Sequence, residues 1–304
     1  MSRVLLDAVP QWTEPYFDPN SGRLSTELTR QLSRRSRVTD ATITVRVRRT
    51  VVITLSSDFG SPYPAAMKGV ISSQTSARLV DVSHDLPRQD VRSAAFWMRE
   101  ILPYFPPAVH LVVVDPGVGT DRDALLVRAA EHVLIGPDNG VLRPVVRVLA
   151  DGGPVEWYQV DDADAASTTF HGRDVFAPAA ATAHGTPIDE LSTIDAVRPV
   201  ADPIDLELQT ATVDGDVAAG TVLAVDDFGN CITNVPGSFV DGHEELLVDG
   251  TRVPIGSTFS AVSPGEAVAV VGSHGNVELD VNRGRGEALF ELDAGDSVTL
   301  ERRR

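Results

Sequence analysis

The chain has 304 residues, about twice the length of a typical single domain, and 42% of them are hydrophobic, which predicts a globular protein with substantial cores. The formal charge of −17 is uneven, because residues 1–50 hold nine arginines against five acidic residues, whereas residues 51–304 hold 17 basic against 38 acidic residues. This acidic main body argues against nucleic-acid binding. The single cysteine, Cys231, excludes an intrachain disulfide and a cysteine-rich zinc site, so we expect it to serve in packing.

No apolar run approaches the roughly 18 to 20 residues of a membrane span, and the N-terminus has no apolar signal core, so we expect a cytoplasmic protein without membrane contacts. Lys68 is the single lysine among 26 basic residues. An acidic, lysine-poor chain is typical of salt-loving archaea, where high ionic strength screens self-repulsion. A GC-rich genome explains the loss of lysine equally well, but the two features together favour a saline cytoplasm.

Residues 1–49 differ from the rest of the chain, with three early prolines and an arginine cluster at 34–37. We interpret them as a disordered extension or as the product of a start codon placed too far upstream. The alternation over residues 42–47 is compatible with one strand. We assign no chemistry to this segment.

From residue 50 to 200 the pattern predicts an α/β domain, since strands and helices alternate with short connections and so imply a layered, largely parallel sheet. The predicted strands span residues 51–55, 79–82, 110–115, 124–127 and 132–135. The predicted helices span residues 65–72, 90–102 and 174–184, the second with Asp90 near its N-terminus.

Residues 201–304 have a different texture, with short apolar runs separated by Gly and Asp, which predicts a small antiparallel β-barrel. The predicted strands span residues 222–225, 231–235, 245–248, 251–253, 267–271, 277–281 and 297–300. Asp249-Gly250 is a hairpin signal.

The segment from His110 to Arg122 carries the clearest site signal. Four apolar residues without alternation indicate a strand covered on both faces, and the chain then opens through Pro116, Gly117 and Gly119. Ligands of α/β sheets bind beyond the carboxyl ends of the strands. Asp115 is therefore expected at the rim of a site.

Several familiar catalytic motifs are absent from the sequence. Asp-Phe-Gly occurs at 58–60 and 227–229, but a protein kinase also needs a His-Arg-Asp loop and a Gly-rich loop, which this chain lacks. The chain also lacks a Gly-x-x-x-x-Gly-Lys loop, a Gly-x-Gly-x-x-Gly turn after the first strand, His-Glu-x-x-His and Gly-x-Ser-x-Gly. The sequence therefore contains no common motif for binding a nucleoside triphosphate or a nicotinamide cofactor. It also contains none for zinc proteolysis or serine hydrolysis.

A set of polar residues remains, each at a strand end or in a Gly-containing loop: Asp58, Asp115, Arg122, Asn139, His171, Arg173, Asp227, Asn230 and Ser273. Each alone has an ordinary structural reading, such as a turn former, a helix cap or a local ion pair. Their occurrence together on one predicted rim favours a functional site.

Six ordered motifs give this set a specific resemblance: Thr54-Leu55-Ser56-Ser57-Asp58-Phe59-Gly60, Val80-Asp81-Val82-Ser83-His84, Asp115-Pro116-Gly117-Val118-Gly119-Thr120-x-Arg122, Gly136-Pro137-Asp138-Asn139-Gly140, Phe170-His171-Gly172-Arg173-Asp174 and Asp226-Asp227-Phe228-Gly229-Asn230. Residues 51–304 thereby resemble the S-adenosyl-L-methionine (SAM) hydroxide adenosyltransferase family, which is related to the bacterial fluorinase and chlorinase.

The resemblance implies hydrolysis of SAM, the substrate, to adenosine and L-methionine, with no cofactor and no metal. Water attacks C5′ of the ribose, and the thioether leaves as neutral methionine, so no general acid is needed. The family positions this water with an Asp, Arg and His triad, which matches Asp115, Arg122 and His171. These three are the expected catalytic residues.

Two alternatives to hydrolysis stay open, a SAM-dependent halogenase and a non-catalytic adenosine- or SAM-binding protein. The related halogenases place tyrosine and threonine at the positions of Asp115 and Val118, and tyrosine at that of His171. A carboxylate repels a halide and Val118 offers it no hydroxyl, so the resemblance favours hydrolysis.

The resemblance also assigns substrate contacts. Asp58 corresponds to the carboxylate that binds both ribose hydroxyls, and Phe228 and Asn230 to residues that hold adenine. The resemblance assigns the methionine ammonium to Asp226, with the adjacent Asp227 as the alternative. The remaining substrate-binding candidates are Asn139 and Ser273, the second as a contact of the methionine carboxylate.

Two departures from the family pattern affect the methionine end: a loop after Asp58 that is two residues shorter, and His274 in place of a halogenase arginine. In the family, the α/β domain of one subunit meets the barrel of its neighbour, and three subunits make three sites. The resemblance therefore implies a homotrimer.

Overall fold

The computed structural model describes residues 17–18, 23–24, 52–163 and 165–303. The chain divides into two compact units, residues 1–49 and 50–304. In the first unit the described residues form two paired antiparallel strands, β1 (Phe17–Asp18) and β2 (Arg23–Leu24). The strand predicted over 42–47 and the character of the remaining extension lie outside the described residues.

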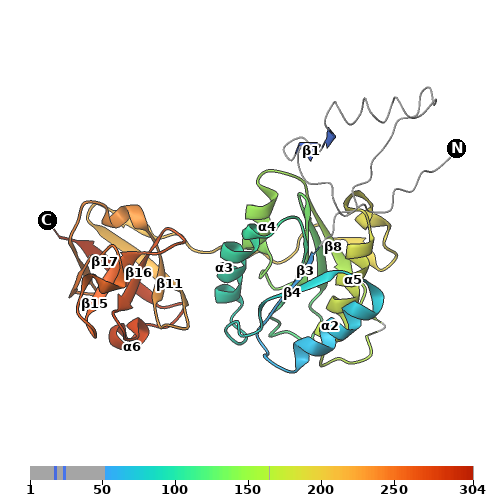
Figure 1. Cartoon of the computed structure of the whole chain (residues 1–304), viewed down its shortest axis with the longest axis horizontal. Coiled ribbons are helices and arrows are strands. Elements are labelled where there is room, and N and C mark those ends of the chain that lie inside the picture. Colours follow the sequence, from blue (N-terminus) through green and yellow to red (C-terminus); the bar gives the residue numbers. More distant parts are fainter. Residues whose placement is uncertain (1–16, 19–22, 25–51, 164, 304) are drawn as a thin grey trace. The chain divides into compact units, whose positions relative to one another are not determined.

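The second unit begins with a seven-stranded sheet in the order β4-β3-β5-β7-β6-β8-β9. Figure 1 shows this sheet with β3, β4 and β8 labelled. Its strands are β3 (Val52–Ser57), β4 (Arg78–Ser83), β5 (Val109–Val113), β6 (Ala124–Ala129), β7 (His132–Pro137), β8 (Val155–Val160) and β9 (Val197–Pro199). Strands β4, β3, β5 and β7 are parallel, and β6, β8 and β9 extend the sheet antiparallel. The predicted α/β class is confirmed, with a mixed sheet whose parallel part carries the predicted βα units.

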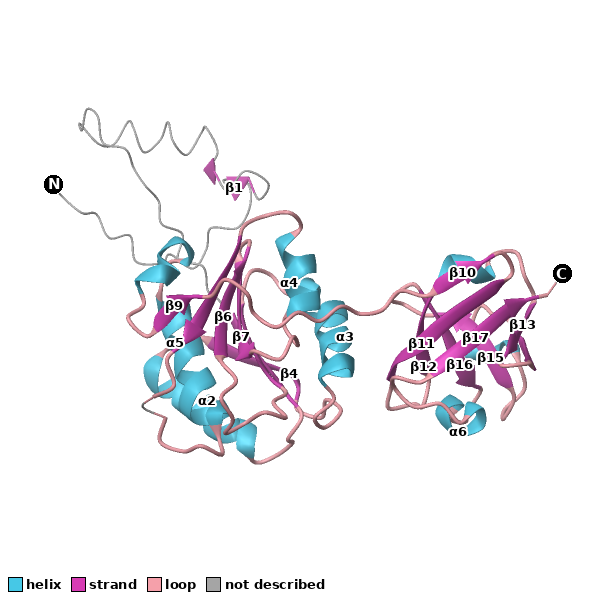
Figure 2. Cartoon of the chain, turned by 180° about the vertical axis from the view of Figure 1, so that it is seen from behind, coloured by secondary structure: helices cyan, strands magenta, loops and turns pink. Residues whose placement is uncertain are grey.

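Helices cover both faces of this sheet (Figure 2). They are α2 (Tyr63–Gln74), α3 (Val91–Ile101), α4 (Arg143–Ala150) and α5 (Ala177–Gly185). Helices α2 and α5 bury the face that contains Leu111, whereas α3 and α4 bury the face that contains Val112. Because both faces of the sheet are covered, every residue of β5 is buried, and its residues 111–113 are the apolar run that the sequence analysis noted.

The helix predicted over 90–102 forms with Asp90 as its N-cap, whose side chain accepts a hydrogen bond from the Ser93 amide at 3.0 Å. Two other predicted boundaries differ. Strand β5 ends at Val113, so Asp115 lies in the loop beyond it. The helix expected from residue 174 begins with a wide turn, Gly172–Phe176, and continues as α5.

Helix α4 and strands β8 and β9 were not predicted from the sequence. Helix α4 has eight residues and begins at Arg143-Pro144, and it is too short to give a clear helical repeat. Strand β8 has a half-exposed pattern without clean alternation. Among the described residues, no helix is both long and apolar enough to cross a bilayer.

The C-terminal region forms an antiparallel sheet in the order β14-β13-β17-β11-β12-β16-β15, with β10 added on β11. Its strands are β10 (Thr212–Asp214), β11 (Val217–Val225), β12 (Cys231–Pro236), β13 (Glu245–Val248), β14 (Thr251–Pro254), β15 (Ala267–Val271), β16 (Asn276–Val281) and β17 (Ser297–Arg302). A bridge between Ile255 and Ala269 joins its two ends. The sheet is therefore a nearly closed barrel, which confirms the prediction; β10 alone was not predicted.

The barrel also contains helix α6 (Gly286–Phe290) and two single-turn helices. Short 3₁₀ helices of the second unit are η1 (Leu102–Tyr104), η3 (Ile188–Thr193), η4 (Gly237–Val240) and η5 (Phe259–Ala261). The predicted hairpin is confirmed, since Asp249 and Gly250 adopt φ of 47° and 87° between the paired residues Val248 and Thr251. Cys231 is buried in the barrel core, and burial together with acidic neighbours raises the pKa of its thiol to about 12, as expected for a packing residue.

Candidate active site

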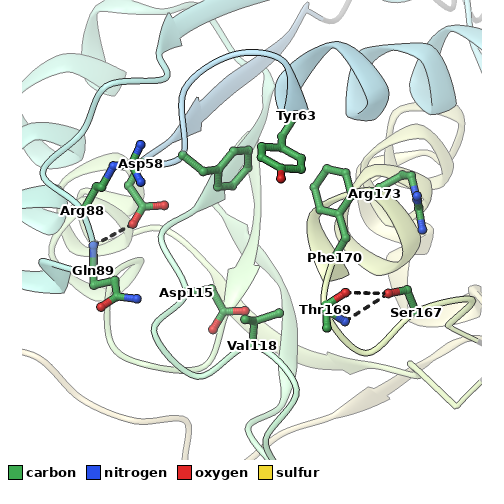
Figure 3. A pocket seen from close by; sticks show the side chains of 11 residues that line it. Asp58, Tyr63, Arg88, Gln89, Asp115, Val118, Ser167, Thr169, Phe170 and Arg173 are labelled. Carbon is green, nitrogen blue, oxygen red and sulfur yellow. Dashed lines mark hydrogen bonds between the residues drawn. The ribbon is translucent and has the colours of Figure 1, made fainter.

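A cavity of about 710 Å³ lies beside the loops that follow β3 and β5 (Figure 3). It is lined by Asp58, Phe59, Tyr63, Arg88, Gln89, Asp115, Val118, Ser167, Thr169, Phe170 and Arg173. Two of the predicted site carboxylates, Asp58 and Asp115, thus share one cavity. Strand β3 pairs in parallel with β5, so both carboxylates follow neighbouring carboxyl ends.

Three aromatic rings form one wall of this cavity. Phe59, Tyr63 and Phe170 contact one another edge to face, with ring centroids 5.4 to 6.2 Å apart. Phe59 follows β3, Tyr63 begins α2, and Phe170 precedes the wide turn. The wall therefore combines segments that are far apart in the sequence.

Asp58 is held by a backbone donor. Its Oδ2 accepts a hydrogen bond from the Gln89 amide at 2.7 Å, which Figure 3 shows as a dashed line. Gln89 has φ of 59°, a left-handed conformation that is uncommon for a residue with a side chain. No hydrogen bond of the described residues occupies the other oxygen, Oδ1, so it can accept from a ligand.

Asp115, Arg122 and His171 form a hydrogen-bonded cluster. Arg122 donates from Nε to Asp115 Oδ1 at 2.9 Å and from Nη2 to Asp115 Oδ2, which is the two-pronged geometry that suits a carboxylate. The same Nη2 lies 2.9 Å from His171 Nδ1. The side chains of Arg122 and Asp115 are only 9% and 6% exposed, and the guanidinium carbon lies 5.0 Å from the centroid of the Phe176 ring. The structure thus brings together the three residues predicted as catalytic.

The arginine determines which nitrogen of His171 carries the ring proton. A guanidinium has donors and no acceptor, so His171 Nδ1 must accept. In a neutral imidazole the proton then resides on Nε2. His171 is therefore arranged to donate from Nε2.

Gly119 allows the loop that carries Asp115 to approach the loop that carries His171. Its φ is 79°, and a Cβ at this position would lie 2.7 Å from the carbonyl oxygen of Thr168. Any side chain there would both strain the backbone and push the two loops apart. Gly119 therefore has a packing role between the two loops.

Asn139 does not line the cavity. Its Nδ2 donates to the carbonyl oxygen of Val114 at 2.9 Å, and its Oδ1 accepts from the Val141 amide at 3.1 Å. It connects the loop after β7 to the residue before Asp115. The structure thus gives Asn139 a backbone-holding contact where a substrate contact was predicted.

Four of the predicted barrel residues line a second cavity, of about 870 Å³: Asp226, Phe228, Asn230 and Ser273. Asp226 organises its own loop, accepting from the amides of Phe228 and Asn230 and from Asn230 Nδ2, all at 2.9 Å. The Phe228 ring is 76% exposed. An exposed aromatic residue beside the Asn230 side-chain amide is suited to a flat, hydrogen-bonding ligand.

Asp227 lies apart from this barrel cavity. It lines a smaller cavity of about 280 Å³ with Asp226 and Phe228. The barrel cavity and the cavity around Asp58 share no lining residue. The predicted site residues of one chain therefore form two groups, one in each domain.

Some lining residues escaped the sequence analysis. Gln89 acts through its backbone amide, which no side-chain pattern indicates, and Phe259 lines the barrel cavity from a single-turn helix. Glu278 also lines that cavity, and its Oε1 lies 2.7 Å from His274 Nε2, in an orientation outside hydrogen-bond geometry. His274, the residue noted for replacing an arginine, is thus directed to a neighbouring acid. Within the described ranges, no group of three His, Cys, Asp or Glu side chains is arranged to hold a metal ion.

Comparison with known proteins agrees with this geometry. The family model of the SAM hydroxide adenosyltransferase N-terminal domain matches residues 53–192, and that of the C-terminal domain matches residues 220–299. The chain belongs to this family. The matches fall on the α/β region with the Asp115 cluster and on the barrel with the second cavity.

Two curated relatives match this chain over nearly their whole lengths. A protein of Salinispora tropica named (R)-S-adenosyl-L-methionine hydrolase is 37% identical over 259 residues, 82% of this chain and 97% of that protein. A protein of the same name from Thermus thermophilus is 40% identical over 257 residues, 80% of this chain and 97% of that protein.

Solved structures share the family fold. The crystal structure of an uncharacterized conserved protein from Thermotoga maritima matches with a TM-score of 0.70 at 29% identity, covering 83% of this chain and 100% of that chain. A conserved hypothetical protein from Thermus thermophilus matches with a TM-score of 0.64 at 36% identity, with the same coverage. Both therefore share the fold of most of this chain.

Proposed function

We propose that this protein hydrolyses SAM to adenosine and L-methionine by attack of water at C5′ of the ribose. The observation that carries the proposal is the Asp115–Arg122–His171 cluster beside a cavity that also holds Asp58. The curated relatives bear the name (R)-SAM hydrolase, and we extend that preference for the R sulfonium epimer to this chain.

The cluster offers a position for one water molecule. Each oxygen of Asp115 keeps a lone pair beyond its bond to Arg122, and His171 presents an Nε2 hydrogen. As the water oxygen bonds to C5′, the C5′–S bond breaks and its electron pair stays on the sulfur of methionine. The proton of the water passes to Asp115, the acceptor in this cluster. The reaction needs positioning and proton transfer but no general acid.

The substrate contacts follow the two groups of residues. We assign the ribose hydroxyls to Asp58 and the adenine to Phe228 and Asn230. The methionine end is assigned to Ser273 and to one of the neighbouring acids, Asp226 or Asp227, of which Asp226 lines the larger cavity. For Asn139 we propose that it positions the Asp115 loop rather than touching the substrate.

We further propose a homotrimer in which residues 50–200 of one copy meet residues 201–304 of the next. The separation of the two cavities supports this arrangement, since neither cavity alone contains contacts for every part of SAM. A mixing experiment at subsaturating SAM tests it: Asp115→Ala abolishes turnover, Phe228→Ala lowers it through weaker binding, and the mixture exceeds the mean of its components when sites are shared. A mixture no more active than that mean, together with a monomer by light scattering, would overturn it.

The proposal treats SAM as the substrate and adds no cofactor. A cytoplasmic location stays a proposal, and adaptation to a saline cytoplasm is proposed from the acidic, lysine-poor composition. Activity that rises between low and molar salt would support the second part. A salt optimum near zero would contradict it.

Turnover in water enriched in heavy oxygen tests the reaction itself. Label in the 5′ hydroxyl of adenosine, with unlabelled methionine, identifies both the nucleophile and the broken bond. In molar chloride, 5′-chloro-5′-deoxyadenosine as the main product would identify a halogenase instead. Tight SAM binding with no product over hours would identify a non-catalytic binding protein.

A further inference from the structure

A chain of four side chains leads from the surface of α2 to the residue before Asp58. Lys68 donates from Nζ to Asp81 Oδ2 at 2.9 Å, and His84 Nε2 lies 3.1 Å from Asp81 Oδ1. On the other side of the ring, His84 Nδ1 lies 2.7 Å from the hydroxyl oxygen of Ser57. We call Lys68, Asp81, His84 and Ser57 the Ser57 relay.

The carboxylate sets the direction of the hydrogen bonds in this relay. Burial raises the pKa of Asp81, but hydrogen bonds from Lys68 and His84 outweigh it and lower the pKa overall, so Asp81 is an acceptor. His84 then donates a hydrogen bond from Nε2 to Asp81. In the neutral ring, Nδ1 accepts a hydrogen bond from the Ser57 hydroxyl. Both ring nitrogens are thereby engaged, which fixes the ring in one orientation.

The order Ser–His–Asp is that of a nucleophilic triad, but the surroundings exclude that role. Ser57 is completely buried within β3 and does not line the cavity beside it. A nucleophile must reach the substrate, and this hydroxyl cannot. The relay therefore acts on its neighbours rather than on a substrate.

Backbone hydrogen bonds join the same two segments. Gly60 donates to the carbonyl oxygen of His84 at 2.9 Å, and Leu86 donates to that of Ser57 at 3.2 Å. The Gln89 amide, presented by a left-handed backbone, then reaches Asp58 Oδ2 at 2.7 Å. The loop of residues 84–89 is thus held at Ser57 and holds Asp58 in turn.

We propose that His84, through the Ser57 relay, is a positioning residue that orients the Asp58 carboxylate toward a ribose diol. The proposal rests on the proposed function for the identity of the ligand. Removing the ring frees the 84–89 loop from the Ser57 hydroxyl. The Gln89 amide and Asp58 then lose their fixed geometry, although neither is altered.

Binding of adenosine tests the proposal without requiring turnover. Loss of the partly buried Ser57–His84 hydrogen bond predicts that His84→Ala weakens adenosine binding about tenfold in calorimetry, while binding of 2′,3′-dideoxyadenosine, which lacks the diol, changes less than about twofold. In an Asp58→Ala background His84→Ala is expected to have little further effect, since coupled residues are not additive. Equal losses for both nucleosides, or additive losses with Asp58→Ala, would overturn the proposal.

Further variants separate positioning from folding. Ser57→Ala should weaken adenosine binding as His84→Ala does, with little change for the dideoxy analogue. Ser57→Thr, which keeps the hydroxyl, should bind adenosine as the wild type does. Lys68→Met, at the surface end, provides a milder change in the same direction. His184→Ala removes a comparable His–Thr75 contact of 2.9 Å elsewhere in the domain and should lower the melting temperature without changing the preference for the diol. A diol preference lost in His184→Ala as well would show that the effect is one of general stability.

With SAM as the ligand, His84→Ala should raise KM more than it lowers kcat, because the relay acts on ribose binding and not on the Asp115 cluster. The outcomes for the two proposals are distinguishable. Diol-dependent adenosine binding without any SAM turnover would reject the hydrolase while supporting the positioning role. Turnover with an unchanged KM in His84→Ala would do the reverse.

Discussion

Arg122 donates from Nη2 to His171 Nδ1 across 2.9 Å, and this contact makes His171 a donor at Nε2. The same guanidinium grips both oxygens of Asp115. One arginine therefore sets both the orientation of the acid and the tautomer of the histidine. The roles proposed for the three residues are unequal: Asp115 accepts the proton, His171 orients the water, and Arg122 holds both.

Asp115→Asn should abolish most turnover while retaining SAM binding. The amide keeps the shape of the carboxylate but cannot accept the water proton, so we expect kcat to fall roughly 100- to 10,000-fold, as for other general bases. Adenosine release under single-turnover conditions measures the loss. Asp189→Asn, which removes the exposed partner of Arg128, is the matched control and should leave kcat unchanged. A kcat within a few-fold of wild type in Asp115→Asn would remove the carboxylate from the mechanism.

Phe259→Ala should weaken adenosine binding. The ring lines the barrel cavity with Phe228, and a stacked aromatic contact contributes about 0.5–1.5 kcal/mol beyond its buried area. We expect Kd for adenosine to rise several-fold, with a smaller change in kcat, by calorimetry and steady-state kinetics. Phe105→Ala, whose ring contacts His110 instead, is the comparison. Equal affinity in Phe259→Ala and wild type would mean that adenine lies elsewhere.

Asp280 should make the barrel less stable as pH rises toward 8. Burial, with Glu278 and Asp226 as acidic neighbours, raises the pKa of Asp280 from 3.8 to about 8, and neither carboxyl oxygen has a hydrogen-bond partner among the described residues. Between these values the unfolded chain loses the proton and the folded chain keeps it, so the free energy of unfolding falls with rising pH. Asp280→Asn removes this dependence and should raise the melting temperature most at pH 8. A constant difference from pH 4 to 8 would contradict the assignment.

The buried His110 should make the protein less stable as pH falls below 6.5. Burial, reinforced by His132, lowers the pKa of His110 from 6.5 to about 3, and its ring lies between Thr54 Oγ1 at 2.8 Å and His132 Nδ1 at 2.9 Å. The folded state resists protonation, so stability is present above pH 6.5 and is lost as pH falls toward 3.

The variant His110→Asn should therefore have a lower stability at pH 7 but a flatter decline below it, measured by denaturant unfolding. His243→Asn on the barrel provides the control for removing a histidine. If the slope below pH 6.5 is the same in wild type and His110→Asn, another group causes the acid sensitivity.

The strength of local patterns explains which parts of the structure were predictable. Strand β5 was recognisable because both its faces are buried, and the hairpin at Asp249-Gly250 because its turn needs left-handed residues. The Asp115 cluster was assigned by resemblance, since residues 115, 122 and 171 meet only through the tertiary fold. Gln89 was not predictable, because its contribution is a backbone amide in a strained conformation that no composition signals. For Asn139 a turn residue and a substrate contact look alike in sequence, and its hydrogen bond to the Val114 carbonyl is a tertiary contact that no local pattern indicates.

Gly119 has a consequence for engineering and for divergence within the family. A Cβ at Gly119 would lie 2.7 Å from the Thr168 carbonyl oxygen. The loop that carries Asp115 and Arg122 therefore packs tightly against the loop that carries His171. A change of length or shape in one demands a compensating change in the other. Attempts to install a different nucleophile should therefore transplant residues 115–122 and 167–172 as a pair, since single-loop grafts would separate the acid from its histidine.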